Sequence, residues 1–275
     1  MSSASLSFID QFVSDLNLAL ESISPQRRLL SKQQIAFLAF ALKAILVTNT
    51  ICWKVWEKMS FKKVTDSGLN WMFYKATIPW LFLLQAAVKV LLKKNSIRKG
   101  VLVIDDSDRS RSKNTTHIGK THKIKDKKTN GYVNGQNLVF LLLVSDTIPI
   151  GFYFYKPDPT YTLWKQQDEK LKKEGVPKKE RPEKPSKNEA YPTKIELASK
   201  LVCSFFKNFP EVNITSVMAD ALYGSSSFFE ALLRMKKGIQ IISQLRYNQN
   251  VIDPTKGKEL SVSTFFHRKE LKNIN

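Results

Sequence analysis

The stretch VLVIDDS, residues 101–107, decides the fold class of this 275-residue chain. Four aliphatic residues in succession are followed at once by Asp105 and Asp106. A short apolar run bounded by turn residues predicts a buried β-strand. A carboxylate at the end of a buried strand is costly to desolvate unless a cation or hydrogen bonds compensate it. The stretch therefore predicts a strand that delivers acidic side chains to a polar site.

A second stretch, ITSVMADALYG at residues 214–224, repeats this design. Its apolar run ends at Asp220, and the turn residues Tyr223 and Gly224 follow. Two acid-bearing strand ends in one strongly basic chain suggest carboxylates that hold a divalent metal, with nucleic acid as the substrate.

The composition favours a polyanionic partner. The chain has 44 Lys and Arg against 24 Asp and Glu, a net charge of +20, and an apolar content of 43%. Such an excess favours nucleic acid through counterion release. A polybasic protein that binds membranes would carry the same sign, so charge alone leaves both classes open. The apolar content and the length predict a folded protein of one or two domains.

Other whole-chain features predict a protein of the reducing cytoplasm, without a membrane span. Cys52 and Cys203 lie in apolar helical patterns and are predicted to be buried thiols. Residues 1–7 lack the basic and apolar segments of a secretory signal. The apolar stretch 35–55 is interrupted by Lys43 and polar residues, which predicts a core helix.

Residues 1–95 are predicted to form a helical region. Ser31 and Gln34 form a capping-box pattern at the start of one helix, and Pro79 starts another. Basic and aromatic side chains in this region suit a small DNA-binding bundle: Trp53, Lys54, Trp56, Lys62, Lys63, Trp71 and Lys75. An ordinary helical domain with a core of aromatic side chains explains the same residues equally well.

Residues 96–275 are predicted to form a second domain with a mixed sheet. Apolar runs at 137–144 and 148–155 predict a hairpin. Residues 156–192 are charged and rich in proline, which predicts a solvated insertion. Thr193 then caps a helix, and a strand, a helix and another strand follow up to residue 244. The fold class expected is α/β, with helices flanking a mixed sheet.

The paired motifs resemble those of the bacterial insertion-sequence DDE transposases, over about residues 70–270. The resemblance implies a ribonuclease-H-like catalytic domain and a Mg²⁺ or Mn²⁺ cofactor. The family's first acid precedes Ser or Thr, which points to Asp106, and the second maps onto Asp220. Asp105 is the competing candidate for the first acid, because neighbouring side chains of a strand point to opposite faces.

The family's third acid, a glutamate accompanied by Tyr and Arg, has no match here. Glu259 and Glu270 lack these companions. The chain therefore resembles the N-terminal part of such an enzyme, and the ribonuclease-H-like domain is expected to be incomplete. It is either a decayed or frameshifted copy or a part completed elsewhere, and it is expected to be inactive alone.

Basic residues cluster directly after the first acidic stretch. They are Arg109, Arg111, Lys113, Lys120, Lys123, Lys125, Lys127 and Lys128. They form either a loop that contacts DNA phosphates or a solvated loop. His117 and His122 are expected to contact phosphate or solvent rather than metal. Tyr223 and Trp164 either stack on bases or pack in the core.

Three hypotheses follow. The first is a transposase-like protein for metal-dependent DNA cleavage and strand transfer at transposon ends, in the bacterial cytoplasm at the nucleoid. Its partners would be double-stranded DNA and either a second copy or a full-length transposase. The second is a non-catalytic DNA-binding fragment that inhibits an intact transposase. The third is a basic membrane-associated protein.

Overall fold

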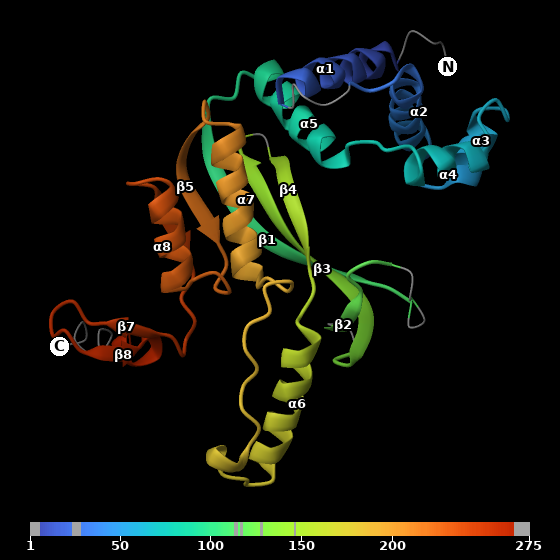
Figure 1. Ribbon diagram of the computed structural model, residues 1–275. Coiled ribbons are helices and arrows are strands. Elements are labelled where there is room, and N and C mark those ends of the chain that lie inside the picture. The colour runs from blue at the N-terminus through green and yellow to red at the C-terminus, as the bar shows by residue number, and fades with distance from the viewer. Residues whose placement is uncertain are drawn as a thin grey trace. The chain divides into compact units, whose positions relative to one another are not determined.

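The computed structural model describes residues 6–23, 29–112, 115, 118–126, 129–145 and 147–266. The chain divides into two compact units, residues 1–98 and residues 99–275 (Figure 1).

The first unit is helical. Its described helices are α1 (Ser7–Ile23), α2 (Lys32–Thr48), α3 (Trp53–Met59), α4 (Asp66–Tyr74) and α5 (Trp80–Lys94). Ser31 and Gln34 form the expected capping box at the start of α2. Helix α4 begins at Asp66, because Thr65 accepts a hydrogen bond from the Gly68 amide and caps it.

Aromatic side chains of this unit are partly core and partly surface. Trp56 is buried and donates from its indole nitrogen to the Thr50 carbonyl oxygen at 2.9 Å. Its ring meets that of Trp53 edge-on, with centroids 4.9 Å apart. Trp71 and Phe61 are exposed. The core interpretation thus holds for Trp56 but not for Trp71.

No single helix among the described residues is long and apolar enough to cross a membrane. Helices α2 and α3 together pass a test of length and composition, but the chain bends by 91° between them. Helix α2 buries Phe37, Leu38 and Ala44 in the core of the first unit.

The second unit contains a six-stranded mixed sheet, which confirms the expected fold class. Its strands are β1 (Lys99–Ser110), β2 (His122–Lys125), β3 (Tyr132–Val144), β4 (Ile148–Tyr155), β5 (Asn213–Ala219) and β6 (Gln240–Ser243). Strand β3 pairs antiparallel with β1, β2 and β4, whereas β5 is parallel to both β1 and β6. Apart from β2, which also pairs with β3, the strands follow the spatial order β4-β3-β1-β5-β6, with β1 at the centre.

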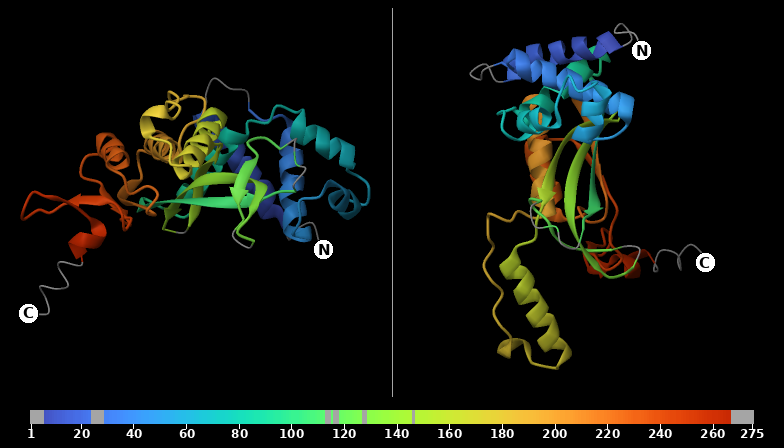
Figure 2. Two further views of the ribbon diagram at one scale, coloured as in Figure 1. Left: turned by 90° about the horizontal axis from the view of Figure 1, so that it is seen from below. Right: turned by 90° about the vertical axis from the view of Figure 1, so that its right-hand side faces the viewer.

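Helices α7 (Lys194–Asn208) and α8 (Ser226–Met235) cover one face of this sheet (Figures 1 and 2). Alternate strand residues, among them Leu102, Ile104, Val139 and Leu141, are fully buried. Side chains of the opposite parity are more exposed, with Met218 and Phe152 the clearest examples. The acidic residue Asp106 has the parity of the buried set.

The charged segment after β4, predicted to be a solvated insertion, contains a helix that buries none of its residues. This helix, α6 (Pro159–Lys173), extends away from the sheet with the returning chain alongside (Figure 1). Asp158 caps this helix. The Trp164 indole donates to the Pro182 carbonyl oxygen at 2.9 Å, and Arg181 pairs with Asp168 at 2.9 Å. These contacts fold the segment onto itself and place Trp164 in a structural role.

The remaining elements lie near the C-terminal end and beside α6. They are a 3-10 turn (Lys178–Glu180) and a two-stranded hairpin, β7 (Asn250–Ile252) and β8 (Glu259–Ser261). The expectation of buried thiols is wrong, because Cys52 and Cys203 are exposed. Cys203 lies on the outer side of α7, between residues that bury against the sheet, and Cys52 precedes α3.

Candidate acidic site

Two neighbouring parallel strands carry the acidic motifs to one region. In the register of β1 with β5, Ile104 pairs with Ala219, so Asp105 and Asp220 each follow a paired residue. Strand β5 ends at Ala219, as expected. Strand β1 does not end at the acids: it continues to Ser110, because β3 pairs with it along Asp105–Ser110. The acids of β1 therefore lie within a strand, held in a rigid extended backbone.

Asp106 lies on the helix-covered face of the sheet. Its carboxylate forms an ion pair with the ammonium group of Lys194, the first residue of α7. Both side chains are largely buried, with exposures of 18% for Asp106 and 21% for Lys194. Helix α7 starts at this point because Thr193 and Glu196 form a capping box. The local cap thus places a lysine directly on the carboxylate.

Tyr155 forms a second contact with this lysine. The Lys194 ammonium lies 5.6 Å from the centroid of the Tyr155 ring, within the range of a cation–π interaction. Burial raises the pKa of the Tyr155 hydroxyl. Lys194 is therefore held between a carboxylate and an aromatic face.

Asp105 differs from its neighbour in orientation and exposure. Strand alternation points it to the opposite face, and the residue is exposed. Its carboxylate accepts a hydrogen bond from the Asp106 amide at 2.7 Å. Asp106 is the more buried of the two candidates for the first acid and the one with a cationic partner.

The second acidic motif forms a tight turn fixed by β6. The Asp220 carboxylate accepts a hydrogen bond from the Leu222 amide at 2.9 Å. The backbone carbonyl oxygen of Asp220 accepts one from the Ser243 hydroxyl at 2.7 Å. A Cβ atom on Gly224 would lie 2.6 Å from the Gln244 carbonyl oxygen, so this position requires glycine. Ser225 then caps α8. The second acidic motif thus holds the Asp220 carboxylate in a turn that packs closely against the end of β6.

Tyr223 belongs to this turn and is completely buried. Its hydroxyl has no hydrogen-bond partner in the described part of the chain. Burial raises the pKa of this hydroxyl, and the negative charges of Asp106, then Asp220, then Asp105 add to the rise. The hydroxyl therefore lies within the electrostatic reach of all three carboxylates. Of the two interpretations offered by the sequence, core packing is the one that the burial of Tyr223 supports.

A polar network that the sequence did not reveal lies next to Asp106. The ring of His122 contacts the Asn137 side-chain oxygen at 2.6 Å and the Lys120 carbonyl oxygen at 3.0 Å. The Asn137 amide nitrogen donates to Asp108. His122 was expected to contact phosphate or solvent, but the pairing of β1, β2 and β3 brings these residues together instead. No local sequence signal predicts a network across three strands.

The basic residues that follow the first acidic stretch separate into several groups. Arg109, Lys123 and Lys125 are exposed on strands β1 and β2. Arg111 donates twice to the Gln136 side-chain oxygen, at 2.8 and 3.1 Å. Lys113, Lys127, Lys128 and His117 lie outside the described residues.

Lys120 lines a cavity of about 430 Å³ at the edge of the sheet, together with Lys156, Lys200, Tyr153 and Phe154. None of the three ammonium groups pairs with a carboxylate among the described residues. Uncompensated cations beside aromatic rings suit a phosphate-bearing ligand.

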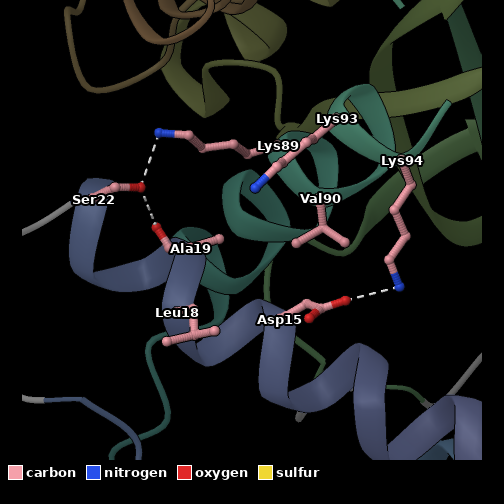
Figure 3. Close-up of a pocket in the computed structure, with 8 residues that line it drawn as sticks. All are labelled: Asp15, Leu18, Ala19, Ser22, Lys89, Val90, Lys93 and Lys94. Atoms are coloured by element: carbon pink, nitrogen blue, oxygen red, sulfur yellow. Dashed lines mark hydrogen bonds and ion pairs between the residues drawn. The ribbon is translucent and has the colours of Figure 1, made fainter. Parts of the chain in front are cut away.

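A second basic cavity, of about 500 Å³, lies within the first unit, between α1 and α5 (Figure 3). Lys94 pairs with Asp15 at 2.8 Å, and the Lys89 ammonium donates to the Ser22 hydroxyl at 2.8 Å. Lys93 also lines the cavity and has no such partner among the described residues.

The donor set at the acidic site is small. Among the described residues, no three His, Cys, Asp or Glu side chains converge closely enough to hold a metal ion. Glu259 is paired with Asn250 in the hairpin β7–β8, and Glu270 lies outside the described residues. Asp106 and Asp220 are oxygen donors of the kind that bind Mg²⁺ or Mn²⁺ together with water and phosphate oxygens.

Comparisons with known proteins yield only distant likenesses. No protein-family model matches the chain. No curated protein matches it either. Among solved structures, it is similar to the Mos1 transposase paired-end complex with the left transposon end, at 9% identity and a TM-score of 0.25, covering 80% of this chain and 61% of that one. It is also similar to a pre-cleavage Mos1 transpososome, at 9% identity and a TM-score of 0.22, covering 86% and 78%. The chain thus spans about three fifths of the first of these proteins, and TM-scores this low place no side chain of the site.

Proposed function

We propose that this chain is a transposase-like DNA-binding protein whose acidic site holds a divalent cation, Mg²⁺ or Mn²⁺, against a DNA phosphate. The observation that carries the proposal is the meeting of two acidic motifs on the adjacent parallel strands β1 and β5. The strand order of the sheet supports the ribonuclease-H-like assignment. The reaction served by such a site is metal-dependent cleavage and strand transfer at transposon ends.

Each residue of the site has a distinct role in this proposal. Asp106 and Asp220 are the metal ligands, and the bound cation supplies an activated water and charge neutralisation at the phosphate. Asp105 remains the alternative to Asp106. Lys194 neutralises Asp106 until the cation arrives, and it can then turn to a phosphate oxygen. The rigid strand and the tight turn hold both carboxylates without help from the DNA.

The DNA-binding role rests on charge that the protein itself does not neutralise. Arg109, Lys123 and Lys125 are exposed on the sheet, and Lys120, Lys156 and Lys200 around the cavity of the second unit add further phosphate contacts. Residues 1–95 would form the DNA-binding region. Duplex DNA at transposon ends is the proposed partner, with a second copy or an intact transposase in the assembly.

A non-catalytic role is the second candidate, and the Asp106–Lys194 ion pair favours it. An ammonium group that already neutralises the carboxylate competes with a divalent cation. No third acidic ligand joins the site in the part of the chain that the structure describes. The chain alone would then bind transposon ends without cutting them, and could inhibit an intact transposase by co-assembly.

A cleavage assay with Mg²⁺ or Mn²⁺ on duplexes that carry transposon ends tests whether the acidic site can cut DNA without a partner protein. We expect salt-sensitive binding and no cleavage by the chain alone, because loss of positioned transition-state electrostatics costs factors of about 10² or more. Asp220→Ala is the control. Cleavage that this substitution abolishes would show a complete nuclease, and failure to bind DNA would overturn both candidates.

A further inference from the structure

The hydroxyl of Tyr223 is one of two buried side-chain polar atoms, with Arg181 Nε, that have no hydrogen-bond partner among the described residues. The residue is completely buried, and its ring packs against Phe228 with centroids 5.8 Å apart. No described residue offers the hydroxyl a hydrogen bond. Buried hydroxyl groups ordinarily have a partner, because burial without one costs stability.

Packing alone does not explain why this residue is tyrosine. Phenylalanine would fill the same volume beside Phe228 without burying an unpaired hydroxyl. The surroundings of the hydroxyl are also specific. Tyr223 lies three residues after Asp220 in the turn that closes on β6, and its amide donates to the Asp220 carbonyl oxygen at 3.1 Å. The charges that act on the hydroxyl are those of the acidic site, with Asp106 the strongest.

No partner for this hydroxyl lies in the part of the chain that the structure describes, and the charges that act on it are those of carboxylates. A hydrated divalent cation fits these surroundings. Its positive charge is held by the carboxylates, and its water molecules donate and accept hydrogen bonds. A phenol can accept from such a water and donate to a carboxylate oxygen. Groups of this kind orient metal ligands without touching the metal.

We infer that Tyr223 is a positioning residue for a divalent cation at Asp106 and Asp220, acting through a water molecule of the cation's hydration shell. The inference rests on the proposed function and adds a residue that the acidic motifs alone do not assign to the metal. Tyr223 is buried within the turn that follows Asp220. It would orient the cation from the protein side and leave the opposite side free for phosphate.

The test is Mn²⁺ binding to the full chain without DNA, followed by electron paramagnetic resonance and calorimetry. Tyr223→Phe should weaken Mn²⁺ binding by about 10–100-fold, the usual effect of removing a group that orients metal ligands. Its thermal stability without metal should equal or exceed that of the wild type, because the variant no longer buries an unpaired hydroxyl. Phe228→Leu is the matched control: it loosens the same packing and keeps the hydroxyl, so it should lower stability and retain Mn²⁺ affinity.

Asp106→Asn and Asp220→Asn distinguish failure of this inference from failure of the proposed site. If both aspartate variants weaken Mn²⁺ binding and Tyr223→Phe does not, the inference is overturned and the metal site stands. If neither aspartate variant changes Mn²⁺ binding, the metal site is overturned together with the inference. A metal-free Tyr223→Phe protein less stable than the wild type would also overturn the inference, because the hydroxyl would then have a partner within the protein.

Discussion

At the scale of single residues, the acidic site is governed by how charge is compensated. Asp106 and Asp105 are neighbours in the chain, yet one is largely buried against Lys194 and the other is exposed. Because an uncompensated charge on the buried side of the sheet is costly, the Asp106 carboxylate is stabilised by a cationic partner. Lys194 provides it in this structure, and a divalent ion would have to compete with that ammonium group.

This competition gives a residue-scale prediction. Lys194→Met should lower the unfolding free energy without metal by roughly 1–3 kcal/mol, because Asp106 loses its partner. The same substitution should raise Mn²⁺ affinity by roughly tenfold, the equivalent of about 1.4 kcal/mol of removed repulsion. Denaturant unfolding and Mn²⁺ titration measure the two effects.

Lys200→Met is the control for this change, since Lys200 lies on the same helix, is exposed and pairs with no described carboxylate. If both variants behave alike, Lys194 does not compete with metal at Asp106.

At the scale of elements, a turn and a helix cap position the side chains of the acidic site. The turn after β5 is closed by the approach of Gly224 to the end of β6, and α7 begins at the capping box of Thr193 and Glu196. The turn sets the place of Asp220, and the cap sets the place of Lys194. Local backbone chemistry thus controls side chains that belong to different parts of the sequence.

The close packing of this turn predicts that Gly224→Ala lowers the stability of the protein. The added Cβ would lie 2.6 Å from the Gln244 carbonyl oxygen, so the turn must shift away from β6. We expect a loss of roughly 1–3 kcal/mol in unfolding free energy, as for other overpacked sites. Gly119→Ala should have little effect in comparison, because a Cβ there meets nothing within 4 Å. Equal stabilities of the two variants in urea would contradict the close approach.

The capping box of α7 predicts how the contribution of Glu196 to stability depends on pH. Hydrogen bonding by Lys187, and then by Thr193, lowers the pKa of Glu196 below its ordinary value of 4.5. A lowered pKa in the folded state means that the carboxylate stabilises the fold above its unfolded pKa, and that this stabilisation is lost as the pH falls through the folded pKa. Glu196→Gln removes the charge and keeps a capping side chain.

The difference in unfolding free energy between wild type and Glu196→Gln should therefore be largest near neutral pH and vanish well below pH 4.5. Solvent screening keeps this difference below about 1 kcal/mol. Urea unfolding from pH 3 to pH 7 measures it. A difference that stays constant over this range would show that the charge of Glu196 contributes nothing.

At the scale of the whole molecule, the chain has a net charge of +20. Of the lysines that the structure describes, some form ion pairs with carboxylates and others do not. On α6, Lys165 and Lys170 face glutamates one helical turn away. Lys123 and Lys125 on β2 have no carboxylate partner among the described residues. Only the second kind of lysine is free to release counterions from DNA without first breaking an ion pair.

The whole-molecule prediction concerns the salt dependence of duplex DNA binding. Lys123→Ala with Lys125→Ala should reduce the slope of log K against log salt by about 0.9 for each DNA phosphate that the protein no longer neutralises. Lys165→Ala with Lys170→Ala makes the same change in net charge on α6 and should leave the slope nearly unchanged. Fluorescence anisotropy between 50 and 200 mM salt measures both. Equal slopes for the two double variants would show that β2 is only solvated.

The sequence by itself determined most of the elements, because their signals are local. Apolar runs predicted the strands that carry Asp106 and Asp220, the two runs after residue 136 predicted the hairpin of β3 and β4, and capping residues placed the starts of α2 and α7. Composition alone missed α6, because the ion pairs and the Trp164 contact that stabilise it are not visible in a charge count. The continuation of β1 past its acids was also missed, since strand pairing with β3 overrides the polar sequence.

Only the tertiary structure decided which charges meet. Lys194 is 88 residues from Asp106, and His122 reaches Asp108 through Asn137 across three strands. The same packing buries the Tyr223 hydroxyl among carboxylates and leaves Cys203 on the outer side of its helix. Periodicity and capping depend on residues a few positions apart, whereas desolvation and ion pairing depend on which faces come together when helices pack on the sheet.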